Sequence, residues 1–169
     1  MNQASNPHSG GGKIMLGIAW VLILGGLYWY FSDREARDAN PNPASVIDVQ
    51  RGELTLTRNR AGHYVADGEI NGRRVTFLLD TGATSVALPL ALGLELNLKR
   101  GAAVTLQTAN GAAPGYQTRL ARVRLGPLEL ADVGAVMSDG LDADFVLLGM
   151  SFLKRVEFTQ RGDQLILRQ

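Results

Sequence analysis

The most constraining feature of the sequence is an uncharged, apolar run over residues 14–31, IMLGIAWVLILGGLYWYF. As an α-helix this run would measure about 27 Å, which is close to the thickness of the hydrocarbon core of a bilayer. Tyr28, Trp29 and Tyr30 stand near its end, and amphipathic aromatic rings of this kind settle among lipid headgroups. We therefore expect a single transmembrane helix over residues 14–31.

Two other structures could contain this run, a buried core helix and a cleaved signal peptide. The run is long for the apolar region of a signal peptide, and no small-x-small cleavage pattern follows it, so an uncleaved anchor is favoured. Its orientation stays open. Lys13 precedes the run while Arg34 and Arg37 follow it, and the positive-inside rule does not decide between these two sides.

The segments on either side of the run are poor in apolar residues. Residues 1–13 are rich in Gly, Ser and Asn, which predicts a disordered N-terminal tail. Residues 32–48 are charged at first and then rich in Pro and Asn, which predicts a flexible linker. The remaining residues, 49–169, are enough for one domain with its own core.

Composition excludes several classes of site. The chain has no cysteine and only two histidines, His8 and His63, so disulfides, thiolate zinc sites, cysteine nucleophiles and a Ser-His-Asp triad are excluded. Lys and Arg total 17 against 16 for Asp and Glu. A net charge of +1 is not the excess of basic residues that is typical of proteins that bind nucleic acid. We expect no nucleic-acid partner and no metal or organic cofactor.

The pattern changes at about residue 49 to short alternating runs separated by Gly, Asn and Pro, which is typical of an all-β domain. The clearest hairpin joins residues 63–70 to 73–79 through Asn71-Gly72, a pair that tolerates the positive φ angles of a type I′ turn. Two more strands flank Gly126-Pro127. A short helix over 150–155 and a closing pair of strands over 156–159 and 164–167 complete the prediction.

The run that carries chemistry is FLLDTGATS, in which an apolar strand delivers Asp80 into a turn of small residues. Asp-Thr-Gly can also be an ordinary exit from a strand into a turn. A carboxylate at the end of a buried strand loses solvation, and a second carboxylate within hydrogen-bonding distance cannot ionise at the same time. Such a pair shares one proton: its ionised member takes a proton from an attacking water, and its protonated member donates to the amide carbonyl and leaving nitrogen.

A second landmark lies downstream, the run VLLGMSFL that contains Gly149. With both landmarks present, the chain resembles the retropepsin-like aspartic proteases over residues 49–169. FLLDTGATS is similar to the active-site loop of that family, and VLLGMSFL is similar to its hydrophobic-hydrophobic-glycine strand and C-terminal helix. The resemblance implies an all-β acid-protease barrel with one short C-terminal helix, here preceded by the transmembrane helix.

The resemblance also implies roles for individual residues. Asp80 would be catalytic, and the loop around it would be supported by Thr81, Gly82, Ala83 and Thr84. The hydrophobic-hydrophobic-glycine support would be Leu147, Leu148 and Gly149. A flap hairpin that closes over the substrate would contain Ala109, Asn110 and Gly111, although Asn-Gly at this place is also compatible with a plain turn.

The chain departs from pepsin-type enzymes, which carry two Asp-Thr/Ser-Gly loops, because it contains only one. One chain therefore holds half a site, and the resemblance implies a homodimer that pairs two copies of Asp80. Three other acids, Asp139, Asp142 and Asp144, lack the following Thr/Ser-Gly and are interpreted as a solvated loop. Neither Ser85 nor Ser151 has the surroundings of a serine nucleophile.

The resulting hypothesis is an aspartic endopeptidase that acts on peptide or protein substrates and is held to a membrane by residues 14–31. The family resemblance further implies a bacterial inner-membrane protein whose catalytic domain faces the periplasm. The alternative is a membrane-tethered domain of the same fold that binds a peptide strand or acts as an adaptor without cleaving.

Overall fold

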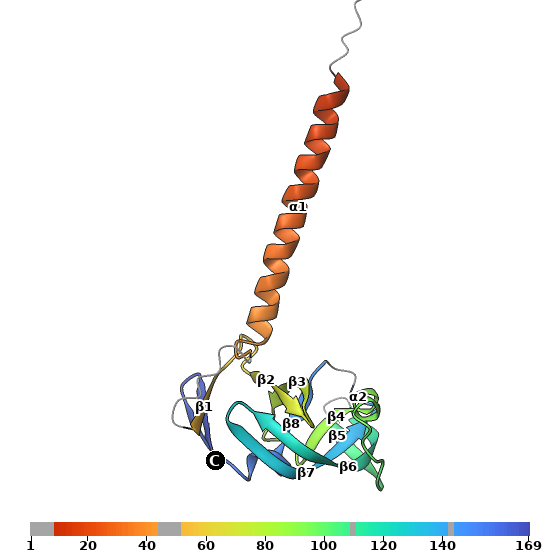
Figure 1. Ribbon diagram of the computed structural model, residues 1–169, viewed down its shortest axis with the longest axis vertical. Coiled ribbons are helices and arrows are strands. Elements are labelled where there is room, and N and C mark those ends of the chain that lie inside the picture. The colour runs from red at the N-terminus through yellow and green to blue at the C-terminus, as the bar shows by residue number, and fades with distance from the viewer. Residues whose placement is uncertain (1–8, 44–51, 109–110, 142–143) are drawn as a thin grey trace, which may run out of the picture. The chain divides into compact units, whose positions relative to one another are not determined.

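A computed structural model of the chain describes residues 9–43, 52–108, 111–141 and 144–169. The chain forms two compact units, Met1–Asp38 and Ala39–Gln169. Among the described residues, the first unit consists of helix α1 as far as Asp38, and the second contains the β-strands (Figure 1).

Helix α1 covers Ser9–Ala39, and its Met15–Ala39 portion is long and apolar enough to cross a membrane. It is longer at both ends than the helix expected over residues 14–31. The expectation of disorder is wrong for residues 9–13, while residues 1–8 lie outside the described part of the chain. Extending an existing helix fixes only one residue for each added hydrogen bond, so flanking residues of modest propensity can join it.

The expectation of a flexible linker over residues 32–48 is also wrong in its first part, because α1 continues to Ala39. Arg37 forms an i,i+4 ion pair with Asp33 at 2.9 Å, and the guanidinium of Arg34 lies 5.2 Å from the ring centroid of Tyr30. Both contacts are local and stabilise a helix. Asn40 and Asn42 then belong to the second unit, and residues 44–48 of the expected linker lie outside the described residues.

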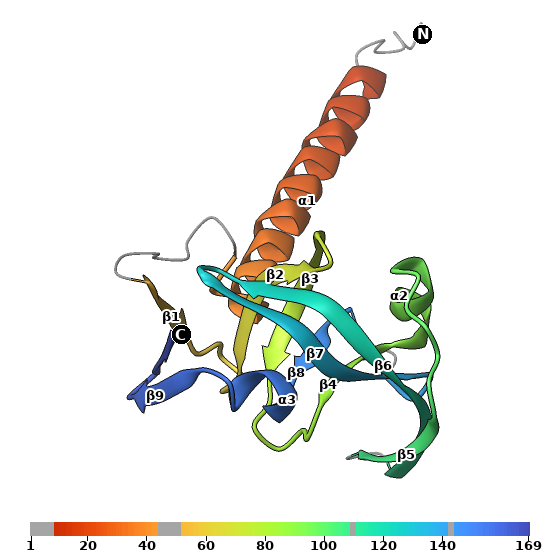
Figure 2. The same cartoon turned by 60° about the horizontal axis from the view of Figure 1, so that its bottom comes forward.

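The second unit is built on a seven-stranded sheet in the order β2-β3-β8-β4-β7-β6-β5. Its strands are β2 (Tyr64–Ile70), β3 (Arg73–Leu79), β4 (Val86–Pro89), β5 (Ala103–Thr108), β6 (Gly111–Leu125), β7 (Leu128–Ser138) and β8 (Val146–Leu148). An additional pairing of β2 with β6 closes the sheet on itself, which produces a barrel-like fold. Figure 2 shows the long β6 and β7 side by side.

A second, three-stranded sheet has the order β1-β10-β9 and joins both ends of the unit. Its strands are β1 (Glu53–Thr57), β10 (Gln164–Arg168) and β9 (Glu157–Arg161). The apolar core contains side chains of both sheets and of α3, and its largest fully buried members include Phe77, Phe152, Leu54, Leu120 and Leu148. The fold class expected from the sequence is confirmed.

The conformations of the turns follow most directly from the residues that form them. Asn71 and Gly72 both have positive φ, at 52° and 86°, as a type I′ turn requires, and Asn71 Oδ1 also accepts a hydrogen bond from the backbone N–H of Arg122. The hairpins on either side of Gly72 and Gly126 are confirmed. The strands predicted near the C-terminus are β9 and β10, and the helix predicted over 150–155 is the shorter α3 (Met150–Leu153).

One helix was not anticipated, α2 (Leu90–Glu95), which follows Pro89 at the end of β4. It packs against β7 through Gly93, where an added Cβ would lie 2.3 Å from the sulfur of Met137. Such a close approach depends on a partner far along the chain. No short-range pattern in the sequence predicts it.

Candidate active site

The two sequence landmarks meet because β3 and β8 pair in parallel, with Phe77 opposite Val146 and Leu79 opposite Leu148. Asp80 follows β3 directly, and its backbone N–H donates to the carbonyl oxygen of Leu148 at 3.2 Å. The carboxylate is thus placed at the end of a strand pair whose buried side chains, Phe77 and Leu148, are part of the core.

The turn after Asp80 folds back onto its side chain. The N–H of Gly82 donates to Asp80 Oδ1 at 2.8 Å, and the N–H of Ala83 donates to the Asp80 carbonyl at 3.3 Å. A Cβ at residue 82 would lie only 3.1 Å from Oδ1, so glycine permits this approach without displacing the carboxylate. A hydrogen bond from a backbone N–H to a carboxylate is charge-assisted and fixes its direction.

The loop is open to solvent on one side. Asp80 and Ala83 are half-buried, while Thr81, Gly82 and Thr84 are exposed. A carboxylate anchored by one oxygen and reached from an open face can meet a substrate or a second protein surface.

Gly149 determines how closely the second landmark approaches the loop. The N–H of Met150 donates to the carbonyl oxygen of Ala83 at 2.8 Å. A Cβ at residue 149 would lie 2.3 Å from the carbonyl oxygen of Ser85 and 2.6 Å from that of Ala83. Both positions are backbone atoms that cannot give way easily, so only glycine fits. The adjacent Leu148 is fully buried and Leu147 is half-buried.

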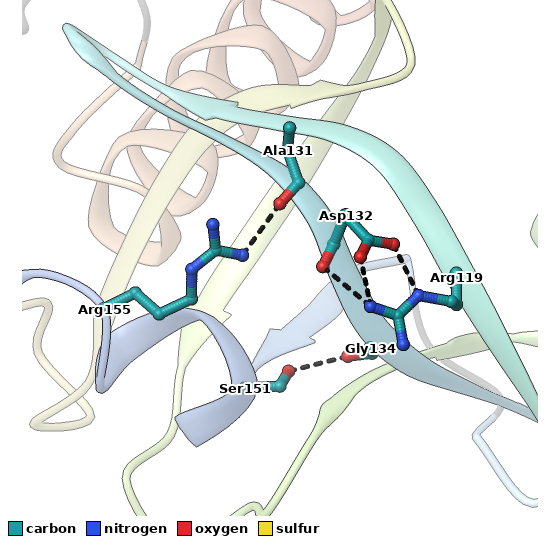
Figure 3. Close-up of polar contacts among 6 residues, drawn as sticks. All are labelled: Arg119, Ala131, Asp132, Gly134, Ser151 and Arg155. Carbon is teal, nitrogen blue, oxygen red and sulfur yellow. Dashed lines mark hydrogen bonds and ion pairs between the residues drawn. The ribbon is translucent and has the colours of Figure 1, made fainter.

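Ser151 has a role that the sequence did not reveal. Its hydroxyl donates to the carbonyl oxygen of Gly134 at 2.7 Å, as Figure 3 shows, and accepts from the N–H of Val86 at 2.9 Å. It therefore joins α3 to β4 and β7 directly behind the loop. Its partners are 17 and 65 residues away in the chain, so no local motif could have indicated this contact.

The hairpin expected to form a flap is made by β5 and β6. Thr108 pairs with Gly111, whose φ is 107°, and the strands run antiparallel from there. Ala109 and Asn110, two of the three residues assigned to the flap, lie outside the described residues. In the sequence this hairpin lies between the two landmarks, and Gly111, the first residue of β6, is exposed.

Of the three other acids considered from the sequence, the two that the structure describes make none of the contacts given above. Asp139 and Asp144 are exposed, and Asp142 lies outside the described residues. Within the described ranges, no three His, Cys, Asp or Glu side chains gather in a way that could hold a metal ion. The chemistry available here is that of a positioned carboxylate.

A groove of about 680 Å³ lies between the segment 97–102 and strands β6 and β7. It reaches Ser85 but is not lined by Asp80. We place the candidate site at the loop because the positioned carboxylate is there.

The clearest electrostatic perturbation is on the surface, between β6 and β7 (Figure 3). Hydrogen bonding from the Arg119 guanidinium lowers the pKa of Asp132, and the same contact raises the pKa of Arg119. Asp132 adopts a positive φ of 53°, and Arg155 donates to the neighbouring carbonyl oxygen of Ala131 at 2.8 Å. These contacts hold β6, β7 and Arg155, which follows α3, together at the surface.

Comparison with known proteins gives consistent matches. A family model described as "gag-polyprotein putative aspartyl protease" matches residues 66–155. The crystal structure of a retropepsin-like aspartic protease from Rickettsia conorii is 34% identical, covers 69% of this chain and 89% of its own chain, and superposes with a TM-score of 0.58.

Two curated relatives are uncharacterized proteins. One, from the cobV 5′ region of Sinorhizobium sp, is 31% identical over 168 residues, which are 92% of this chain and 72% of the relative. The other, from Rickettsia prowazekii (strain Madrid E), is 34% identical over 130 residues, which are 74% of this chain and 55% of the relative.

Proposed function

This chain belongs to the family of retropepsin-like aspartic proteases, and from that premise we propose that it is an aspartic endopeptidase with Asp80 as its catalytic carboxylate. The observation that carries the proposal is the position of Asp80. Its N–H is bonded to Leu148, and its Oδ1 accepts from the N–H of Gly82 at 2.8 Å. Two backbone contacts thus orient one carboxylate at an open loop.

The second carboxylate comes from a second copy of the chain. The sequence contains a single Asp-Thr-Gly loop, and a two-fold axis through two such loops brings the Asp80 side chains face to face. Asp80 is half-buried and Thr81 is exposed in one chain, so both are available to a partner. The threonine hydroxyls then hydrogen-bond across the pair and hold the loops rigid.

In this dimer the pair of carboxylates shares one proton. The ionised member accepts a proton from a water molecule as that water attacks the carbonyl carbon of the peptide bond. The protonated member donates to the carbonyl oxygen, and the resulting tetrahedral intermediate expels the amine after that nitrogen receives a proton. Peptide and water become a carboxylic acid and an amine, with no metal ion involved.

The surrounding residues support this pair. Ala83 and Gly149 hold the loop against β8 through the bond from Met150, and Leu147 and Leu148 pack behind it. The β5–β6 hairpin, in which Thr108 pairs with Gly111, closes over the backbone of the bound peptide.

We place the enzyme on a membrane, held by residues 14–31 within α1. The supporting observation is that α1 is apolar and that its side chains over residues 15–31 are exposed in this structure. The domain then acts on the periplasmic side of a bacterial inner membrane. Fractionation of cells, followed by protease protection of the domain in intact spheroplasts, tests both the anchoring and the side.

The decisive experiment is digestion of a peptide library by the full chain in detergent, with the Asp80→Asn variant as control. Cleavage by the wild type alone supports the proposal. Peptides that are bound but left intact by both proteins would instead identify a non-catalytic peptide-binding or adaptor domain of the same fold.

A further inference from the structure

The segment that follows α1 is fastened to the domain by its asparagines. Asn42 is 5% exposed, and its side-chain amide donates to the carbonyl oxygens of Thr57 and Val65, both at 2.8 Å. Its Oδ1 accepts from the N–H of Thr57 at 2.7 Å. Both donor hydrogens and the acceptor oxygen of this buried amide are therefore bonded to the domain. Such bonds offset the free-energy cost of burying a polar group.

Neighbouring contacts extend the attachment. Asn40 donates to Asp67 Oδ1 at 2.8 Å, and its own Oδ1 accepts from the N–H of Asn42 at 3.0 Å. The N–H of Asp67 donates to the carbonyl oxygen of Asn42 at 3.3 Å, and Asn59 donates to that of Ala39 at 3.0 Å. We call residues 39–42 the clasp. Without such contacts, this segment would be poorly ordered and could separate from the domain.

Because residues 39–42 are bonded to the domain, they do not form the flexible spacer that the sequence predicted. Helix α1 ends at Ala39, and the clasp begins there, so no free residue separates the two. The apolar run ends at Phe31, which leaves residues 32–39 as the whole tether. As the helix that they form, these eight residues span about 12 Å.

The pairing of the strands also limits the distance from the clasp to the candidate active site. Asn42 forms a β-bridge with Ala66, which pairs with Phe77 on β3, three residues before Asp80. Strands lie about 4.8 Å apart and rise about 3.3 Å per residue, so Asp80 is roughly 14 Å from Asn42. Even with the clasp residues fully extended, Asp80 stays within roughly 40 Å of the end of the apolar run.

We propose that the clasp restricts this enzyme, among membrane-anchored substrates, to peptide bonds that lie within roughly 40 Å of the bilayer surface. The inference rests on the proposed function and on the anchoring of α1. A short tether raises the effective concentration of targets that it can span, and reduces it to nearly zero for targets that it cannot.

The test uses the full chain in liposomes together with two single-pass probe peptides. Both probes carry the best-cleaved decapeptide from the library digestion. In the near probe it directly follows the membrane helix. In the far probe it is separated from that helix by a stiff, continuous helical spacer of about 40 residues, or about 60 Å. The free decapeptide, added in solution, reports the activity of the enzyme independently of reach.

Two variants lengthen the tether. One carries about 30 Gly/Ser residues inserted between Ala39 and Asn40, which add roughly 30 Å of average reach. The other is Asn42→Ala, which removes the side-chain bonds that hold the clasp. The control carries the same insertion after Gly162, an exposed turn residue between β9 and β10, where it adds mass without lengthening the tether.

The wild type and the control should cleave the near probe at least about tenfold faster than the far probe. The insertion should bring the ratio of these rates to within about threefold, mainly by accelerating cleavage of the far probe. Asn42→Ala should lower the ratio by a smaller amount, because it loosens the clasp without adding residues. Equal cleavage of both probes by the wild type, with normal cleavage of the free decapeptide, would overturn the restriction but not the protease activity. Absence of any cleaved peptide in the library digestion would, by contrast, overturn the proposed function itself.

Discussion

The backbone N–H of Asp80 donates to the carbonyl oxygen of Leu148, which connects the end of β3 to the end of β8. The bond explains why an Asp-Thr-Gly loop and a distant Leu-Leu-Gly run occur together in one chain. Each run alone is a common exit from a strand. Together they hold a single carboxylate in a defined place, and the following predictions test what that carboxylate does.

Replacing Asp80 by asparagine should abolish hydrolysis while the domain stays folded. Asparagine preserves the shape and an acceptor for the N–H of Gly82, but it cannot act as the general base. Peptide cleavage and circular dichroism measured on the same sample check this. Residual activity within about tenfold of the wild type, a cost of only about 1.4 kcal/mol in the barrier, would exclude Asp80 as a catalytic group.

Mixed dimers of wild-type and Asp80→Asn chains should be nearly inactive, because a single carboxylate cannot share a proton with a partner. With equal amounts of the two chains under exchange, about one quarter of the dimers are fully wild type. Activity should follow the square of the wild-type fraction in a titration at constant total protein, with exchange confirmed by a tag-based assay. A linear decline would contradict a site shared between two copies.

Activity should be highest at acid to near-neutral pH and should fall as the pH rises. The mechanism needs one proton on the carboxylate pair, and alkaline pH removes the proton that the leaving nitrogen receives. A rate profile with the library-derived peptide, recorded with and without a metal chelator, provides the measurement. A rate that increases steadily into alkaline pH, or that is lost with the chelator, is incompatible with the carboxylate pair.

Gly149→Ala should destabilise the domain by about 2–3 kcal/mol and reduce activity further by displacing the loop, since the new Cβ would lie 2.3 Å from the carbonyl oxygen of Ser85. Gly134→Ala is the matched control, because an added Cβ there meets nothing within 4 Å. Denaturant unfolding of both variants gives the comparison. Equal stability of the two would show that the close approach at Gly149 is not required.

Ser151→Ala should lower the free energy of unfolding by about 1–3 kcal/mol, because the N–H of Val86 and the carbonyl of Gly134 lose their shared partner. Its kcat, measured well below the unfolding temperature, should stay within about threefold of the wild type, as expected for a residue that takes no part in the chemical step. Ser85→Ala serves as the control for removing a half-buried serine hydroxyl from the same region. A complete loss of activity in a folded Ser151→Ala protein would point instead to a role in the chemistry.

The sequence alone was sufficient for features that depend on neighbouring residues. Asn71-Gly72 predicted its turn, because positive φ at two successive positions is a local requirement that few residue pairs meet. The apolar run predicted α1 through its length and lack of charge, and the alternation of apolar and polar residues predicted the long strands. Asp80 and Gly149 could be singled out because each lies within a recognisable run.

Only the tertiary structure decided which distant groups meet. The pairing of β3 with β8 joins Asp80 to Leu148, and the packing of β7 places Met137 against Gly93 and thereby positions α2. The sequence placed Asn42 in a flexible linker, yet its side-chain amide is buried and donates to the carbonyl oxygens of Thr57 and Val65. No local pattern in the sequence predicts these partners. Local patterns record the conformational preferences of adjacent residues, whereas contacts between remote residues depend on how strands pair and on which buried polar groups then find partners.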